Sequence, residues 1–384
     1  MDALEKNGAH VVHEVRDEFD PIFDAFRRDI PPYSWLDFVK FMITIPLLPL
    51  RVANALFWVF ACYFSYLTFG PRLTKQKKRH SKAVAANDAA QQQTTRANAT
   101  DALGTGDTAS ERAAQPSNST SNSVELVPAY RQKILTFCGR FCARMMLLSF
   151  GFVRVAYVDE PGYDYEEAKH YTVCSNHVSM IDILVFMSYN MPSFVAKESV
   201  SHIPLVGRIA TAAQSLYVDR LSSGAGNVTE KIIQRQRALA ELQDDKTPVA
   251  PLLIFPEGTT ENGKCLIPFR SGAFVAGYPV SVYILKYPYS KLSPSYDTIN
   301  GGWLILRLLT EMYNSVEIHR FKPYYPSEAE KKDAKLYAKK AAAYFADKGG
   351  LGLSEGSFPD KLEYFAIVRG TKLPAWVIPR EQKS

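Results

Sequence analysis

The chain has 384 residues, of which 47% are hydrophobic and 22% charged, so it can build one large or two modest globular domains. Its formal net charge of +6 is mild and its basic residues follow no nucleic-acid-binding motif, which excludes nucleic acid as the expected partner. The same balance suits an anionic membrane surface or a phosphate-bearing ligand.

Residues 1–34 form a polar segment, and residues 35–70 are strongly apolar. The second half of the apolar segment runs from Val52 to Gly70 without a charged side chain, which is long enough to cross a bilayer as a helix. The first half contains Lys40 and two prolines. A buried core helix is the alternative, but such helices rarely run this far without a polar face. We therefore expect residues 35–70 to be a membrane helix or a helical hairpin.

Residues 71–124 begin with the basic stretch PRLTKQKKRHSK. The positive-inside rule places this end on the cytosolic side of the membrane. The rest of the segment is Ala, Gln, Thr, Ser and Asn with almost no large apolar side chains, which predicts a disordered linker. The sequons at Asn98 and Asn118 are then expected to stay unglycosylated, because they lie on the cytosolic side.

Residues 125–325 are predicted to form one catalytic domain. It opens with a helical pattern over residues 130–152, in which basic and apolar residues interleave. After it, β-rich runs alternate with helical stretches, which predicts an α/β sandwich around a buried sheet. The expected strands are Thr172–Cys174, Phe194–Ala196, Ser215–Val218, Leu252–Phe255 and Val280–Leu285.

Residues 326–384 are expected to form a C-terminal helix and tail that pack on the catalytic domain. Ser327 and Glu330 have the spacing of a capping box, which predicts a helix from there to about Asp347.

The first motif that carries chemistry lies within YTVCSNHVSMID, residues 171–182. A strand-like run ends at His177, and an apolar run containing Asp182 follows. In one regular helix these two side chains would point about 140° apart, so a His–Asp pair needs a strand end, a turn and then a helix. Asp182 would then accept a hydrogen bond from one imidazole nitrogen and leave the other free to take a proton. Alone, the motif also fits a histidine satisfied within the core.

Two further strand ends carry polar residues. PLLIFPEGTTENG, residues 251–263, is a buried strand that runs into a turn bearing Glu257, and SLYVDR, residues 215–220, ends in Arg220. Ligands bind at the carboxyl ends of strands in α/β sheets, and an arginine there can bind a phosphate. A capped turn and a surface ion pair would explain each separately. Three such strand ends in one chain predict a single shared crevice.

The motifs HVSMID, YVDR, FPEGTT and YPVSVYILKYP resemble, in order and spacing, the four motifs of the glycerolipid acyltransferases, the 1-acylglycerol-3-phosphate acyltransferase-like superfamily. The resemblance covers about residues 135–296. FPEGTTENGKCLIPFRSGAF followed by YILKYPYSKLSPSYDTI looks most like the lysophosphatidylcholine and lysophosphatidylethanolamine acyltransferase branch. The implied fold is of the α/β class, an αβα sandwich acyltransferase domain with an N-terminal membrane-embedded helical segment.

The resemblance also implies a mechanism. His177 would be the general base that takes the proton from the free hydroxyl of a lysophospholipid, and that oxygen would attack the thioester of acyl-CoA. Asp182 would hold the imidazole in its tautomer and stabilise its charge. No metal and no cofactor is implied beyond acyl-CoA as co-substrate. The implied substrate-binding residues are Arg220 for the phosphate, and Glu257, Gly258, Thr259 and Thr260 around the glycerophosphate.

One departure bears on the headgroup. Many lysophosphatidic acid acyltransferases have an arginine after Glu-Gly-Thr, where this chain has Thr260. One fewer cation suits a phosphodiester better than a phosphomonoester. Lysophosphatidylcholine or lysophosphatidylethanolamine is therefore the expected acceptor, and lysophosphatidic acid is the alternative. No EF-hand loop follows residue 300, so calcium control through such a module is not expected.

The expected protein is a membrane-bound acyl-CoA:lysophospholipid O-acyltransferase of the endoplasmic reticulum or a related endomembrane. Its catalytic domain would face the cytosol, where acyl-CoA is found. A catalytically silent membrane-remodelling scaffold is the non-enzyme alternative, although both His177 and Asp182 are present. A serine hydrolase is a third possibility, but the chain lacks the G-x-S-x-G nucleophile motif.

Overall fold

A computed structural model describes residues 21–28, 35–70, 129–218, 225–241, 249–288, 293–296, 299–374 and 376–377. The predicted linker over residues 71–124 and the phosphate-binding candidate Arg220 lie outside these residues.

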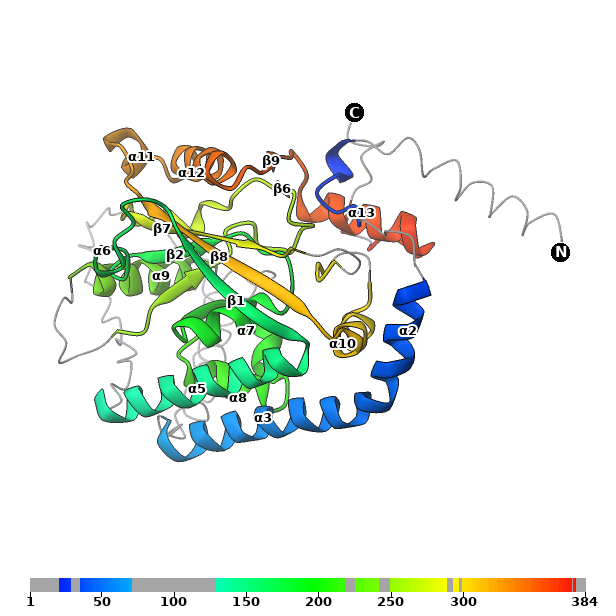
Figure 1. Cartoon of the computed structure of the whole chain (residues 1–384). Helices are drawn as coiled ribbons and strands as arrows, with labels where there is room; N and C mark the ends of the chain where they lie inside the picture. Colours follow the sequence, from blue (N-terminus) through cyan, green and yellow to red (C-terminus); the bar gives the residue numbers. More distant parts are fainter. Residues whose placement is uncertain are drawn as a thin grey trace, which may run out of the picture. The chain divides into compact units, whose positions relative to one another are not determined.

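Within the described residues, seven strands form one sheet in the order β1-β8-β7-β2-β5-β3-β4 (Figure 1). Their bounds are β1 (Phe152–Asp159), β2 (Thr172–Ser175), β3 (Ser193–Lys197), β4 (Leu216–Val218), β5 (Leu252–Ile254), β7 (Val280–Lys286) and β8 (Asn314–Tyr324). The neighbouring strands β7, β2, β5, β3 and β4 run parallel, whereas β8 is antiparallel to β7. The predicted α/β class with a largely buried sheet is confirmed.

Strand β7 shows why the centre of this sheet could be predicted. Its residues Val280 to Leu285 are all buried, because helices cover both faces of the sheet at this point. Such a strand reads as a short continuous apolar run. The outer strand β1 pairs with β8 and is mostly exposed along its length, so its sequence carries no such run and the strand was not predicted.

Helices cover both faces of the sheet. On one face, α9 (Ala225–Glu241) and α12 (Ala334–Gly349) share a hydrophobic core with β2, β5 and β7. On the other face lie α5 (Ala129–Ser149) and α7 (Asp182–Tyr189), where Phe186 of α7 stacks on Tyr283 of β7 with ring centroids 6.4 Å apart. The domain is thus an αβα sandwich.

The C-terminal part differs from the single helix that was predicted. Ser327 and Glu330 do form a capping box, as expected, but the helix they begin, α11 (Glu328–Lys332), ends at once. Asp333 has extended backbone angles, and its side chain accepts hydrogen bonds from the first backbone N–H groups of α12. Because aspartate caps a helix better than it continues one, the chain restarts there as a second helix. Helix α13 (Phe358–Arg369) follows.

The apolar N-terminal segment is helical. It consists of α2 (Trp35–Thr44), the short 3-10 helix η2 (Ile45–Leu47) and α3 (Leu48–Phe69). Together, Phe38–Phe69 are long and apolar enough to cross a membrane. Figure 1 shows α2 and α3 as two arms of a bent helix, with α3 lying along α5.

Polar contacts tie α3 to the sandwich. The guanidinium of Arg51 donates hydrogen bonds to the carbonyl oxygens of Leu309 and Glu311, at 2.7 and 2.6 Å, where α10 (Gly301–Thr310) ends. A cation at that position satisfies free carbonyl groups and complements the helix dipole. The remaining short elements are η1 (Pro21–Phe23), α6 (Tyr165–Ala168), η3 (Glu198–His202), α8 (Val206–Ala212), η4 (Ser271–Ala273) and the paired strands β6 (Cys265–Leu266) and β9 (Gly352–Leu353).

Candidate active site

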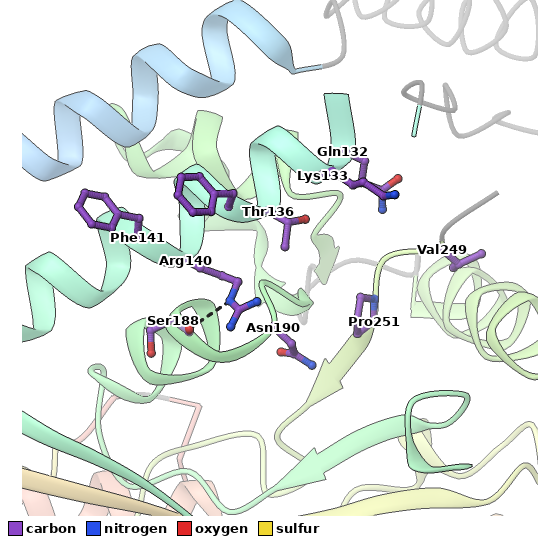
Figure 2. Close-up of a pocket in the computed structure, with 10 residues that line it drawn as sticks. Gln132, Lys133, Thr136, Arg140, Phe141, Ser188, Asn190, Val249 and Pro251 are labelled. Atoms are coloured by element: carbon purple, nitrogen blue, oxygen red, sulfur yellow. Dashed lines mark hydrogen bonds between the residues drawn. The ribbon is translucent and has the colours of Figure 1, made fainter. Parts of the chain in front are cut away.

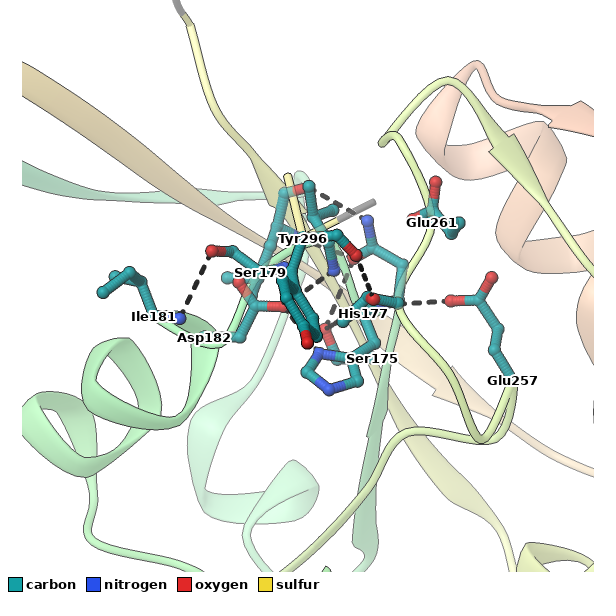
Figure 3. A network of polar contacts seen from close by, with 12 residues as sticks. Ser175, His177, Ser179, Ile181, Asp182, Glu257, Glu261 and Tyr296 are labelled. Carbon is teal, nitrogen blue, oxygen red and sulfur yellow. Dashed lines mark hydrogen bonds and ion pairs between the residues drawn. The ribbon is translucent and has the colours of Figure 1, made fainter. Parts of the chain in front are cut away.

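A histidine–aspartate pair lies at the carboxyl end of β2. The strand ends at Ser175, a turn carries His177, and α7 begins at Asp182, so the local geometry follows the strand–turn–helix expectation. His177 Nδ1 lies 2.8 Å from Asp182 Oδ2 (Figure 3). The same carboxylate oxygen accepts the backbone N–H groups of Val178 and Ser179 at 2.7 and 2.9 Å. Three contacts on one oxygen of this fully buried side chain fix its orientation toward the ring.

The pairing leaves one ring nitrogen available. With Nδ1 donating to Asp182, Nε2 is unprotonated in the neutral tautomer and can accept a proton from a substrate. One face of the ring stacks on Phe255, with centroids 4.0 Å apart and planes 12° apart. The side chain of His177 is 19% exposed, so the ring is fixed in place and still reaches the surface. This arrangement suits a general base.

Tyr287 is part of the site and was not predicted. Its hydroxyl donates a hydrogen bond to the second oxygen of Asp182, Oδ1. Burial, reinforced by the Asp182 charge, raises the pKa of Tyr287 well above its ordinary value, so the phenol remains a donor. Asp182 thus has hydrogen-bond donors on both oxygens. Tyr287 lies 105 positions after Asp182 in the chain, beyond the end of β7, and no local sequence pattern links the two residues.

The FPEGTT turn supports the backbone of His177. Glu257 is 2% exposed, and its two oxygens accept the backbone N–H groups of His177 and Ile267 at 3.0 and 3.2 Å. The backbone N–H of Glu261 donates to the carbonyl oxygen of His177 at 2.8 Å. Burial raises the pKa of Glu257 to about 8, against the lowering effect of the two backbone donors. The carboxylate of Glu257 therefore faces the His177 backbone instead of an open pocket rim.

Gly258 occupies a conformation that favours glycine. Its φ is +70°, and a Cβ atom there would lie 2.6 Å from Nε of Arg270. The exposed guanidinium of Arg270 thus lies directly beside the turn, where it can pair with a phosphate oxygen. Arg270 was not predicted from the sequence.

The two threonines that follow face inward to different degrees. Thr260 is 7% exposed, and its hydroxyl donates to the carbonyl oxygen of Tyr296 at 2.5 Å. The hydroxyl of Thr259 lies 3.3 Å from Nζ of Lys361. Of the predicted site residues, the structure therefore brings His177 and Asp182 into contact and puts the turn from Glu257 to Thr260 against them, while Arg220 is not among the described residues.

A pocket of about 860 Å³ lies beside α5, at the amino ends of β3 and β5 (Figure 2). Asn190 and Pro251, which precede β3 and β5, lie on its wall, whereas His177 follows the end of β2. Because these strands are parallel, the pocket is separated from His177 by the length of the strands. It is not part of the histidine site. Within the described residues, no group of three or more His, Cys, Asp or Glu side chains is placed to hold a metal ion.

Comparisons with known proteins find similar acyltransferases. Residues 162–286 match the family model described as Acyltransferase. The chain is 37% identical over 269 residues to Lysophospholipid acyltransferase LPEAT1 of Arabidopsis thaliana, covering 63% of this chain and 65% of the relative. It is 34% identical over 241 residues to Lysophosphatidylcholine acyltransferase of Drosophila melanogaster, covering 61% of this chain and 43% of the relative. The chain thus spans less than two thirds of the length of these relatives.

Lysophosphatidylcholine acyltransferase 1 of Homo sapiens is similarly related, at 31% identity over 243 residues, covering 62% of this chain and 43% of that protein. Among solved structures, the 1-acyl-sn-glycerophosphate (LPA) acyltransferase PlsC of Thermotoga maritima is similar with a TM-score of 0.36 at 17% identity, covering 56% of this chain and 81% of that one. This last likeness is too distant to support the site.

Proposed function

We propose that this chain, whose residues 162–286 form an acyltransferase-family domain, is an acyl-CoA:lysophospholipid O-acyltransferase. The resemblance to the glycerolipid acyltransferases and their lysophospholipid branch is confirmed by the family match and the named relatives. The proposed mechanism rests on the His177–Asp182 pair, in which Nδ1 lies 2.8 Å from Oδ2. The other hydrogen bonds of the aspartate side chain hold it facing the imidazole ring.

The proposed reaction needs no covalent enzyme intermediate. Nε2 of His177 takes the proton from the free hydroxyl of the lysophospholipid, and that oxygen forms a bond to the thioester carbon of acyl-CoA. The tetrahedral intermediate then expels the CoA thiolate, breaking the carbon–sulfur bond. The thiolate takes the proton from His177, which restores the neutral base. Asp182 stabilises the imidazolium that exists between the two proton transfers.

The proposed acceptor site lies beside the FPEGTT turn. Thr259 and Gly258 would face the glycerophosphate, Arg220 would bind its phosphate, and Glu257 and Thr260 would support the turn from its buried side. A cation, Lys361, does lie 2.8 Å from the hydroxyl of Thr260, but its side chain is 3% exposed. It is therefore not presented to a phosphomonoester, so Arg220 and the exposed Arg270 beside Gly258 are the cations proposed for the phosphate, and a phosphodiester lysolipid remains the proposed acceptor.

A substrate panel tests this function. Microsomes containing the chain receive labelled oleoyl-CoA together with lysophosphatidylcholine, lysophosphatidylethanolamine, lysophosphatidic acid or glycerol-3-phosphate, and microsomes without the chain give the background. We expect labelled phosphatidylcholine or phosphatidylethanolamine. In the same panel, Arg220→Gln is expected to raise the KM for the lysophospholipid, because a phosphate contact is lost.

The other outcomes of the panel are decisive too. Preference for lysophosphatidic acid would retain the mechanism and reject the headgroup assignment. Absence of transfer to all four acceptors, with free CoA not released above background, would reject the acyltransferase proposal and favour the scaffold alternative.

We further propose that α2 and α3 embed the protein in one leaflet, with the active site on the side where acyl-CoA is found. Helix α3 lies along α5 and is bound to the end of α10 through Arg51, so it cannot stand upright across the bilayer without leaving the sandwich. Lys40 adds an ion pair to Glu311 at 3.2 Å. The exposed large apolar side chains of α2 and α3 are Trp35, Phe38, Phe41, Met42, Ile43, Leu50, Leu56, Phe57, Phe60, Phe64 and Leu67. Exposed apolar side chains of this kind are typical of helices that lie among the acyl chains of one leaflet.

Protease protection distinguishes the in-plane from the spanning arrangement. Epitope tags are placed before Met1 and after Ser384, and sealed microsomes are treated with protease from outside. We expect both tags to be digested, while alkaline carbonate leaves the protein in the membrane pellet. Protection of the first tag alone would show that the helix crosses the bilayer. Release by carbonate would contradict embedding.

A further inference from the structure

A buried lysine from the C-terminal helix reaches the turn that supports the catalytic histidine. Lys361 belongs to α13, which lies outside the segment matched by the family model, and its side chain is only 3% exposed. The N-terminus of α13 is fixed by a capping box between Ser357 and Asp360. The ammonium group lies 5.9 Å and 5.3 Å from the ring centroids of Phe26 and Phe365, which flank its path into the interior. A lysine is almost never fully buried unless its ammonium group is paired with other groups.

The ammonium group of Lys361 joins two loops. It donates to the hydroxyl of Thr260 at 2.8 Å and to the carbonyl oxygen of the same residue, and the hydroxyl of Thr259 lies at 3.3 Å. From the second loop, the carbonyl oxygen of Tyr296 lies at 3.3 Å. The hydroxyl of Thr260 also donates to that carbonyl. Two carbonyl dipoles thus converge on one cation, and without it they would lack that donor.

Both loops hold the turn that carries His177. On one side, the side chain of Glu257 accepts the backbone N–H of His177 at 3.0 Å, and the backbone N–H of Glu261 donates to the carbonyl oxygen of His177 at 2.8 Å. On the other side, the backbone N–H of Tyr296 donates to the carbonyl oxygen of Val178 at 2.9 Å. Lys361 is therefore two hydrogen bonds from the His177 backbone along the first loop and two from the backbone of its neighbour Val178 along the second, and it touches neither the ring nor Asp182 among the contacts described.

The charge of Lys361 also acts on the acids around the site. Glu257, Glu261 and Asp182 are all buried. Burial raises the pKa of both glutamates, and the positive charge of Lys361 lowers both again. The charge of Asp182 works in the opposite direction on the glutamates. Removing the cation leaves the two glutamates with less compensation, which favours their protonated forms.

We propose that Lys361 is a positioning residue for the acyl-transfer reaction: from α13 it locks the loops around Thr260 and Tyr296 together, and through them it holds the backbone of His177. The inference rests on the proposed function. Helix α13 is thus part of the catalytic apparatus, although it is remote in sequence from the four motifs.

Lys361→Met and Lys361→Arg test this role, because methionine matches the length of the stem without the charge and arginine keeps the charge. We expect Lys361→Met to lower kcat roughly 10- to 100-fold, since small displacements of a catalytic group cost this much, with the KM for the lysophospholipid changed by less than about twofold. The acid limb of its kcat–pH profile should move to higher pH, because Glu257, whose carboxylate accepts the backbone N–H of His177, then needs a higher pH to ionise. Lys361→Arg should recover part of kcat and the wild-type acid limb.

Exposed Lys331→Met on α11 is the matched control and should behave like wild type. Equal losses of kcat in the Met and Arg variants would show a merely structural lysine and overturn the proposal. So would a loss of kcat that parallels the fall in melting temperature while the acid limb stays in place.

Carbethoxylation of His177 by diethyl pyrocarbonate, followed by peptide mass mapping, gives a second readout that needs no turnover. We expect the rate of carbethoxylation at His177 to change in Lys361→Met relative to wild type and Lys331→Met. If wild type transfers no acyl group, the proposed function fails, but this measurement still decides the role of Lys361. An unchanged rate at His177 would overturn it.

Discussion

Replacing His177 with alanine is expected to abolish acyl transfer while the protein stays folded. A positioned general base contributes roughly 10²- to 10⁴-fold to a reaction rate, and this ring is positioned by Asp182 on one edge and Phe255 on one face. In the proposed mechanism the nucleophile is the hydroxyl of the substrate, so no other side chain takes over its activation. Turnover of purified protein in nanodiscs, with melting temperature measured in parallel, checks the prediction.

The chain offers a closely matched control. His319 on β8 lies 3.0 Å from Glu317, is also 19% exposed, and stacks on Phe321 with centroids 6.5 Å apart. It is a histidine with a carboxylate partner and an aromatic neighbour, but it lies in the middle of a strand. We expect His319→Ala to retain activity. Equal activity of the His177→Ala and wild-type proteins would refute the general-base role, and equal losses in both histidine variants would point to stability instead.

Replacing Asp182 with asparagine is expected to cut kcat by roughly 10²- to 10⁴-fold with little change in KM. The amide oxygen can still accept from the backbone of Val178 and Ser179, so the shape of the turn is retained. The amide has no negative charge to stabilise the imidazolium, and its NH₂ group meets the hydroxyl of Tyr287, which then has to accept instead of donate. The loss therefore falls on the proton-transfer step.

Stability has to be measured alongside turnover. Losing the charge on a buried acceptor that serves several donors costs about 1–3 kcal/mol, so we expect a lower melting temperature as well. Asp159→Asn, which breaks the ion pair with Arg320 on β8, provides a comparison with a similar chemical change away from His177. Wild-type turnover in Asp182→Asn would contradict the pairing. A loss confined to KM would mean that Asp182 acts in binding.

The sequence by itself determined the local features of the site. Each of these features lies within a few residues: a strand that ends at Ser175, a turn that carries His177, and a helix that begins with Asp182. The strands β3, β4, β5 and β7, of which β5 precedes Glu257, were predicted for the same reason, because continuous apolar runs and turn residues are local patterns. The family resemblance of the motifs was confirmed by the comparisons.

Only the tertiary structure decided which distant side chains complete the site. Lys361 meets Thr260 across 101 positions, and Tyr287 meets Asp182 across 105. It also decided that Glu257 holds the backbone of His177 and that α3 lies along α5. Periodicity and turn signals describe a residue's neighbours in the chain, whereas these contacts depend on how strands are ordered and where helices dock. That order follows from burying the whole core at once, which no short stretch of sequence specifies.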